Sequence, residues 1–177
     1  GSGTIIQDVL VNSLVPEGKK ICVVNNGAYS ARMVEIAEYY HIPCVDLKFP
    51  STGLPDLAVV KETLEKDKDI AVVATVHHET GTGVLNPIKE IGRMAHDNDA
   101  VFVVDTISTY GLIPLDIEEQ NIDFLMSSAQ KGLAGMTGAS WTVGNIEEIK
   151  KSKDYPTRSY YCNLFMQYDF FERIGAM

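Results

Sequence analysis

A lysine and a carboxylate stand where two predicted strands end, and together they are suited to cofactor chemistry. Lys131 follows the apolar stretch FLMSS inside the segment SSAQKG, and Asp105 ends the apolar stretch VFVVD. A lysine amine can bond covalently to a carbonyl compound, and a carboxylate can keep the nitrogen of a heterocycle protonated so that the ring accepts electrons. The two residues therefore predict a cofactor that has both a carbonyl group and a ring nitrogen.

A phosphate group would complete such a cofactor, and the segment GSGT over residues 1–4 predicts where it binds. This segment stands at the start of a helix pattern, where free backbone N–H groups and the positive end of the helix dipole attract anions. This segment would thus form a site for an anion such as a phosphate. Pyridoxal 5′-phosphate needs a lysine, a carboxylate and phosphate donors, so we predict it as the cofactor.

The elements that must position these residues alternate between helix and strand. Apolar residues at helical spacing predict helices over 5–14, 30–40, 57–66 and 87–97, and short apolar runs predict strands over 21–24, 44–49, 70–76, 101–105 and 124–128. Strands that are apolar throughout are typical of sheets with helices on both faces. The predicted fold class is therefore α/β, with a mostly parallel, doubly wound sheet.

Such a sheet would bring the chemical groups to one edge, because ligands collect beyond the carboxyl ends of parallel strands. The 26 residues from Asp105 to Lys131 suffice for a crossover that returns as the neighbouring strand. Two helix starts have local signals: Asp56 is predicted to cap one helix, and Asn86 to cap the helix that Pro87 begins. After residue 150 the pattern becomes aromatic-rich and irregular.

Composition argues against several classes of protein. The length of 177 residues predicts a single domain over 1–177, and a net charge of −9 without a Lys/Arg-rich face argues against a nucleic-acid partner. No apolar run approaches the roughly 20 residues that span a bilayer, so no membrane partner is expected. Cys22, Cys44 and Cys162 have neither disulfide nor zinc spacing and fit a cytoplasmic location. His77 and His78 should point to opposite faces of a strand, one packed and one near the site, so no metal is expected.

Five motifs in unbroken order resemble those of the class V, fold-type I aminotransferases: GSGT, NGAYSARM, HHETGTGVLNPI, VVDTISTYGLIPLDI and DFLMSSAQKG. The resemblance covers residues 1–145 and is greatest to the 2-aminoethylphosphonate:pyruvate aminotransferases, followed by the alanine:glyoxylate and serine:pyruvate aminotransferases. It implies the large, cofactor-binding domain of a homodimeric enzyme. Family members also have an amino-terminal arm and a small carboxy-terminal domain, so we expect this chain to be a fragment without them.

The resemblance also implies a role for each site residue. Lys131 would attach the cofactor and transfer protons, and Asp105 would pair with the pyridine nitrogen. Tyr29 would stack on the ring, and Thr80 would lie near the ring hydroxyl and the substrate. The phosphate would be held by Ser2, Gly3 and Thr4, with Ser128 and Gln130 as further contacts.

The implied reaction moves an amino group from 2-aminoethylphosphonate to pyruvate, giving phosphonoacetaldehyde and alanine. Gln130 is more similar to the alanine:glyoxylate relatives, which leaves an alanine or serine donor open, and Arg158 cannot be matched to the arginine that binds the substrate carboxylate in the family. A lyase or a cysteine desulfurase is another alternative, with Cys162 as the one loosely placed cysteine. A domain that folds without catalysis is the non-enzymatic alternative.

Each residue also has a purely structural interpretation. Lys131 would then be a solvated charge, Asp105 the cap of the following turn, and Tyr29 a packed aromatic side chain. The order of the five motifs, rather than any one of them, favours the site.

Overall fold

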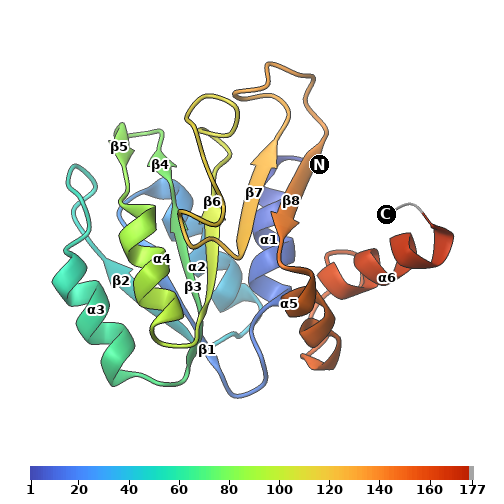
Figure 1. Cartoon of the computed structure of the whole chain (residues 1–177), viewed down its shortest axis with the longest axis horizontal. Helices are drawn as coiled ribbons and strands as arrows, with labels where there is room; N and C mark the ends of the chain where they lie inside the picture. Colours follow the sequence, from blue (N-terminus) through green and yellow to red (C-terminus); the bar gives the residue numbers. More distant parts are fainter. Residues whose placement is uncertain (176–177) are drawn as a thin grey trace.

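The computed structural model of the protein describes residues 1–175 and centres on a six-stranded sheet (Figure 1). Residues 176 and 177, the last two of the predicted domain, lie outside the described part. Five neighbouring strands are parallel, and the strand at one edge is antiparallel to its neighbour. In spatial order the strands are β2 (Cys44–Lys48), β1 (Lys20–Asn25), β3 (Ile70–Val76), β6 (Val101–Asp105), β7 (Phe124–Ser128) and β8 (Ser140–Gly144).

Helices cover both faces of the sheet, which confirms the predicted doubly wound α/β architecture (Figure 1). One face carries α1 (Gly3–Ser13) and α2 (Ala28–Tyr39), and the other carries α3 (Leu57–Lys66) and α4 (Ile88–His96). Side chains of β1 alternate between the two cores: Val23 packs in the first, and Cys22 and Val24 pack in the second. Burial on both faces explains why the strand sequences are apolar throughout. Within residues 1–175, no helix is long and apolar enough to cross a membrane.

One of the two predicted helix caps is confirmed and the other is wrong. The Asp56 carboxylate accepts a hydrogen bond from the backbone N–H of Ala58 at 2.9 Å and caps α3. In contrast, α4 is preceded by Pro87, and the Asn86 side chain does not cap it. Asn86 is buried, and its amide donates instead to the carbonyl of Val76 at 2.7 Å. A buried amide needs partners, and the end of β3 supplies one.

The chain after residue 150 is more regular than its sequence indicated, which corrects that expectation. After β8 come α5 (Ile146–Lys151) and a 3-10 turn (Ser152–Asp154). The last element is α6 (Leu164–Ile174). Asn163 caps α6 by accepting a hydrogen bond from the backbone N–H of Met166 at 2.9 Å. Phe170 and Phe171 are exposed on this helix, and Leu164 is its buried residue.

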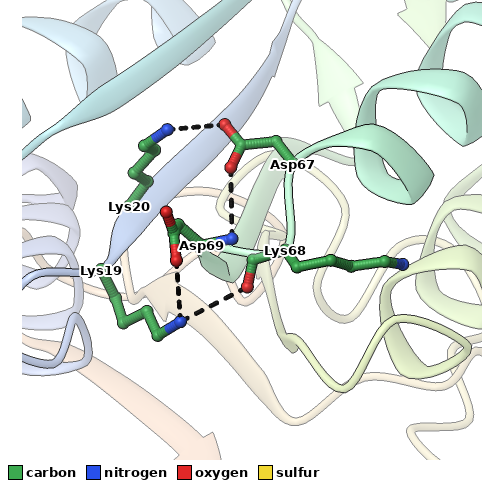
Figure 2. Close-up of polar contacts among 5 residues, drawn as sticks. All are labelled: Lys19, Lys20, Asp67, Lys68 and Asp69. Atoms are coloured by element: carbon green, nitrogen blue, oxygen red, sulfur yellow. Dashed lines mark hydrogen bonds and ion pairs between the residues drawn. The ribbon is translucent and has the colours of Figure 1, made fainter.

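Ion pairs tie together the amino ends of β1 and β3 (Figure 2). The amine of Lys20 lies 2.8 Å from the Asp67 carboxylate, and the amine of Lys19 lies 3.0 Å from the Asp69 carboxylate. The hydrogen bond between Lys20 and Asp67 raises the pKa of the lysine and lowers the pKa of the aspartate. Pairs this exposed add little to the free energy of unfolding, but they fix the turn that leads into β3.

Candidate active site

Four predicted site residues meet in one pocket at the carboxyl edge of the sheet. Asp105, the last residue of β6, is in register with Val76 at the end of β3 and with Met126 on β7. The pocket is narrow and partly open to solvent. Its lining consists of Tyr29, Val76, His78, Thr80, Asp105, Ile107, Ser108 and Lys131.

A second, wider hollow adjoins this pocket at the start of α1. Tyr29, Ile107 and Lys131 line both spaces, so the two belong to one site. The other lining residues are Ser2, Gly3, Thr4, Gln7, Arg32 and Gln130. The structure therefore brings all the predicted site residues except Ser128 to the walls of this site. A larger hollow lies at the opposite end of the strands, and none of the predicted site residues lines it.

Asp105 is a buried carboxylate whose two oxygens each accept one hydrogen bond. Oδ1 accepts from the backbone N–H of Ile107 at 2.9 Å, and Oδ2 accepts from the side-chain amide of Gln7 at 2.6 Å. Burial raises the pKa of Asp105 to about 6, while these two hydrogen bonds and the Arg32 charge act in the opposite direction. The contact with Ile107 also caps the following turn, so the structural interpretation of Asp105 holds alongside the chemical one. A buried carboxylate of this kind would be stabilised by a cationic partner in the pocket.

Lys131 follows β7 and is exposed, as its structural interpretation expected, yet it lines both parts of the site. Among residues 1–175 its amine has no hydrogen-bond or ion-pair partner. Gly132 holds the backbone at this point close to the preceding loop. A Cβ atom at Gly132 would lie 2.2 Å from the carbonyl oxygen of Tyr110. Only glycine permits this approach without a shift of the chain.

The amino end of α1 is open, as the anion-site prediction requires. Ser2 makes no side-chain capping bond, and the first turn contains no acidic residue. Gly3 is buried, and a Cβ atom there would lie 2.5 Å from Cδ1 of Ile107. The absence of a side chain at Gly3 thus lets the helix start approach the residue that follows Asp105 by two positions. Free N–H groups and the helix dipole give this end a positive potential.

Arg32 is a site residue that the sequence analysis missed. Its guanidinium lies 5.2 Å from the centroid of the Tyr29 ring and donates a hydrogen bond to the Thr4 hydroxyl at 3.1 Å. The sequence pattern that could have identified Arg32 is its spacing of three residues from Tyr29, because this spacing places both side chains on one face of α2. Arg32 adds a positive charge beside the open end of α1.

Glu79 is a second residue that was missed, and it supports the position of Tyr29. It belongs to a small hairpin made of β4 (His78–Glu79) and β5 (Val84–Leu85). Its buried carboxylate accepts hydrogen bonds from the backbone N–H groups of Ser30 at 2.9 Å and of Tyr29 at 3.3 Å. An acidic group at a helix start satisfies free N–H groups and the helix dipole together. No local signal linked Glu79 to α2, because the two are far apart in the sequence.

Three polar side-chain atoms are buried without a partner among residues 1–175. They are the amide oxygens of Gln7 and Gln130 and the hydroxyl oxygen of Ser128. Buried polar atoms are nearly always hydrogen-bonded in folded proteins, so these atoms favour a ligand that supplies the missing bonds. Gln130 lines the hollow at the start of α1, whereas Ser128 does not, and a ligand contact of Ser128 stays a prediction.

The two adjacent histidines separate as predicted, one packed and one at the site. His77 is buried, its Nδ1 lies 2.9 Å from the Thr109 hydroxyl, and burial lowers its pKa to about 4. His78 lines the pocket. The Ser108 hydroxyl donates to the carbonyl of His78 at 2.9 Å, so His78 Nδ1, 3.2 Å from the same hydroxyl, must be the donor in that contact. Within residues 1–175 no cluster of His, Cys, Asp and Glu is arranged to hold a metal ion.

Arg158 lies apart from the site, in agreement with the failure to match it to a substrate-binding arginine. Its guanidinium donates to the carbonyls of Asn12 at 2.8 Å and Val15 at 3.0 Å. It thus satisfies carbonyl groups at the carboxyl end of α1, which is a structural role.

Comparison with known proteins agrees with this geometry. A protein from Klebsiella pneumoniae and one from Syntrophobacter fumaroxidans, both named 2-aminoethylphosphonate–pyruvate transaminase, are 38% and 39% identical over 95% and 99% of this chain. A bifunctional phosphonoacetaldehyde hydrolase/aminoethylphosphonate transaminase from Clostridioides difficile is 38% identical over 98% of the chain. The matched part is 46%, 47% and 27% of these relatives, so the chain spans half of their length or less.

Solved structures match the fold over nearly the whole chain. A ureidoglycine–glyoxylate aminotransferase from Bacillus subtilis superposes with a TM-score of 0.89 at 25% identity, over 97% of this chain and 44% of the other. An alanine–glyoxylate aminotransferase from Nostoc sp. gives 0.88 at 24% identity, over 97% and 46%. The profile of the family described as aminotransferase class-V matches residues 2–154. The chain therefore belongs to the class-V aminotransferase family.

Proposed function

We propose that this protein is an aminotransferase that moves an amino group from 2-aminoethylphosphonate to pyruvate. The observation that carries the proposal is the identity of 38–39%, over 95–99% of the chain, to relatives named for this reaction. The site residues support the reaction class, because a lysine, a carboxylate and an anion-binding helix start lie around one pair of hollows.

Members of this family depend on pyridoxal 5′-phosphate, and the residues of the site fit that cofactor. When bound, its protonated ring accepts the electron pair that an amino donor releases as it loses a proton. The buried Asp105 carboxylate needs a cationic partner, and a protonated ring nitrogen is one. The unpartnered oxygen atoms of Ser128 and Gln130 are a second point of agreement, because a polar ligand would satisfy them.

Asp105 would hold the ring nitrogen in its protonated form. Each of its oxygens has a lone pair left after the bonds from Ile107 and Gln7, and an N–H group of the ring would donate to one of them. A charge-assisted hydrogen bond in a buried site is stronger than one in water. Asp105 thereby keeps the ring able to accept electrons.

Lys131 would attach the cofactor and then act as the base. Its amine has no partner among residues 1–175 and lines both hollows, so it can reach a ligand that spans them. Once released from the cofactor, Lys131 Nζ would take the proton from the carbon atom of the amino donor. It would then give this proton to another atom of the bound donor and cofactor. Thr80 and His78 line the same pocket and would contact the ring hydroxyl or the substrate.

The phosphate would bind at the open start of α1, where Ser2, Gly3 and Thr4 line the second hollow. Arg32 donates to the Thr4 hydroxyl at 3.1 Å and adds a positive charge at this end. Tyr29 lines both hollows, and this position supports a stacking role for its ring.

A glyoxylate-linked reaction is the second candidate. The sequence resemblance relates Gln130 to the alanine:glyoxylate aminotransferases. Two similar solved structures are also glyoxylate aminotransferases. Their identity to this chain is 24–25%, well below that of the phosphonate relatives. An alanine or serine donor is therefore the alternative within the same reaction class.

The cysteines disfavour a desulfurase. Such an enzyme needs a reactive thiolate near the cofactor, but none of the three cysteines lines either hollow. Burial raises the pKa of Cys22 and of Cys44 to about 12, and it also raises the pKa of Cys162. All three thiols would thus be protonated at neutral pH.

The test compares amino donors by kcat/KM. We expect 2-aminoethylphosphonate with pyruvate to exceed alanine or serine with glyoxylate by at least about tenfold. If alanine or serine proves the better donor, the aminotransferase class stands and the phosphonate assignment is wrong. A visible spectrum with pyridoxal 5′-phosphate comes first, because a protein that gives no band of covalently attached cofactor would match the non-enzymatic alternative.

We also propose that the protein acts as a homodimer in the cytoplasm. The cysteines of the described chain are free, which fits a reducing compartment. Leu133 and Met136, beside Lys131, and Tyr160 and Tyr161, near α6, expose large apolar surfaces that a second subunit would cover. Light scattering on the purified protein measures the oligomeric state, and a monomer at micromolar concentration would contradict the dimer.

A further inference from the structure

The side-chain amide of Gln7 makes a direct contact with the Asp105 carboxylate that the resemblance did not identify. Gln7 lies on α1, 98 positions before Asp105, and its Nε2 donates to Oδ2 of Asp105 at 2.6 Å. Both side chains are almost fully buried, with exposed fractions of 1% and 2%. We propose that Gln7 is a positioning residue, which holds the Asp105 carboxylate in the orientation that a cationic ring nitrogen requires. This inference rests on the proposed function.

The orientation of the Gln7 amide follows from its partners. Nε2 also lies 3.3 Å from the carbonyl oxygen of Tyr29, so its two neighbours are a carboxylate and a carbonyl. A carbonyl oxygen and an ionised carboxylate accept hydrogen bonds and have no hydrogen to donate. Only the NH₂ end of the Gln7 amide has two hydrogens to donate to them. The reversed amide would place its oxygen against two acceptors. One amide thus ties α1 to the end of β6 and to the start of α2.

The Asp105 carboxylate is fixed in its plane by two donors from different elements. Oδ1 is held by the backbone N–H of Ile107 at 2.9 Å, and Oδ2 is held by Gln7. Without Gln7, the backbone contact alone would leave the carboxylate free to rotate about one bonded oxygen. A second fixed donor is what sets the direction of the remaining lone pairs.

Electrostatics assigns Gln7 a second effect. Burial raises the pKa of Asp105, and the nearby Glu79 carboxylate raises it further, whereas the hydrogen bonds from Ile107 and Gln7 and the charge of Arg32 lower it. His78 and Lys131 also line the pocket that Asp105 faces. Gln7 is the one neutral side chain among the groups that favour the ionised carboxylate, and the ionised form is the one that pairs with a cation.

The test substitutes Gln7 by methionine, which keeps the length of the side chain but removes the donor. The control is Asn12→Leu, which removes another buried amide of α1, one that contacts Asp8 and the carbonyl of Cys162 and not the site. Carboxyl ¹³C NMR of aspartate-labelled, cofactor-free protein follows the titration of Asp105, whose signal is identified by its loss in Asp105→Asn. Absorbance titration measures the affinity for pyridoxal 5′-phosphate.

We expect Gln7→Met to raise the pKa of Asp105 by about one unit and to weaken cofactor binding roughly tenfold, with neither change in Asn12→Leu. An unchanged Asp105 titration in Gln7→Met, or equal changes in both variants, would overturn the proposal. If Gln7→Met does not fold, Gln7→Glu replaces it, because a second carboxylate must raise the pKa of Asp105 further, and an unshifted titration again overturns the proposal. The NMR readout needs no cofactor, so failure of the proposed function would show separately, as absence of cofactor binding in the wild-type protein.

Discussion

The carboxylate of Glu79 accepts hydrogen bonds from both the backbone N–H and the hydroxyl of Ser30, at 2.9 and 2.7 Å. These contacts join the hairpin after β3 to the first turn of α2, 49 positions earlier in the sequence. The same carboxylate accepts from the N–H of Tyr29 at 3.3 Å. The position of the proposed stacking residue therefore depends on a buried charge outside the site.

Replacing Glu79 by Gln should lower the free energy of unfolding by about 2 kcal/mol, because hydrogen bonds to a charged acceptor are lost in a buried place. Urea unfolding measures the change. Glu65→Gln, at an exposed position on α3, is the control and should change stability by less than about 0.5 kcal/mol. Equal losses in both variants would mean that the Glu79 contacts add no more to the free energy of unfolding than an exposed carboxylate does.

Borohydride reduction in the presence of pyridoxal 5′-phosphate should leave a stable adduct on the peptide that contains Lys131. The reason is that Lys131 is the lysine that lines both hollows of the site. Mass spectrometry of the digested protein locates the adduct. Lys131→Ala should remove it, and an adduct on another lysine of the wild-type protein would show that the assignment is wrong.

Asp105→Asn should slow proton removal from the amino donor by at least about a hundredfold, which corresponds to roughly 2.7 kcal/mol of activation free energy. An amide cannot keep the ring nitrogen protonated, although the cofactor itself can still bind. Single-turnover absorbance measurements follow this step. Near-normal rates in the variant would place another residue at the ring nitrogen.

In the cofactor-free protein, Asp105→Asn should stabilise the fold at neutral pH. The pKa of Asp105 is raised from 3.8 to about 6, so the folded protein holds this proton more tightly than the unfolded chain does. The contribution of Asp105 to stability is therefore complete below pH 3.8 and is lost as the pH rises through 6, at a cost of up to about 3 kcal/mol. Asp105→Asn avoids this cost.

We accordingly expect the stability of Asp105→Asn relative to wild type to increase between pH 4 and pH 7, as measured by urea unfolding at each pH. Asp97→Asn, on the exposed end of α4, should show no such trend. A constant difference for Asp105→Asn across this range would mean that the carboxyl titrates near its ordinary value.

Gly132→Ala should disturb the site, because its Cβ atom would lie 2.2 Å from the Tyr110 carbonyl oxygen and force the backbone beside Lys131 to move. We expect weaker cofactor binding and a loss of stability of about 1–3 kcal/mol. Gly53→Ala is the matched control, since no atom lies within 4 Å of its added Cβ. Similar behaviour of the two variants would show that the approach to Tyr110 is not needed.

The sequence by itself determined the fold class and where most of the predicted site residues lie. Uniformly apolar runs such as 70–76 and 101–105 can be buried on both faces only in a sheet with helices on each side, and the structure has that arrangement. Parallel strands have their carboxyl ends at one edge, so Asp105 and Lys131 had to lie near one another. Asp56 was predicted as a cap because a cap is decided within a few residues.

The tertiary structure alone decided which side chains support the site. Gln7 reaches Asp105 across 98 positions, and Glu79 reaches Ser30 across 49, so neither contact leaves a trace in a local window of sequence. Asn86 has the local signal of a cap, but its burial beside Val76 gave it other partners. Local patterns report the preferences of neighbouring residues, whereas these contacts depend on how α1, α2 and the hairpin pack on the sheet, and only packing brings such distant groups within hydrogen-bond distance.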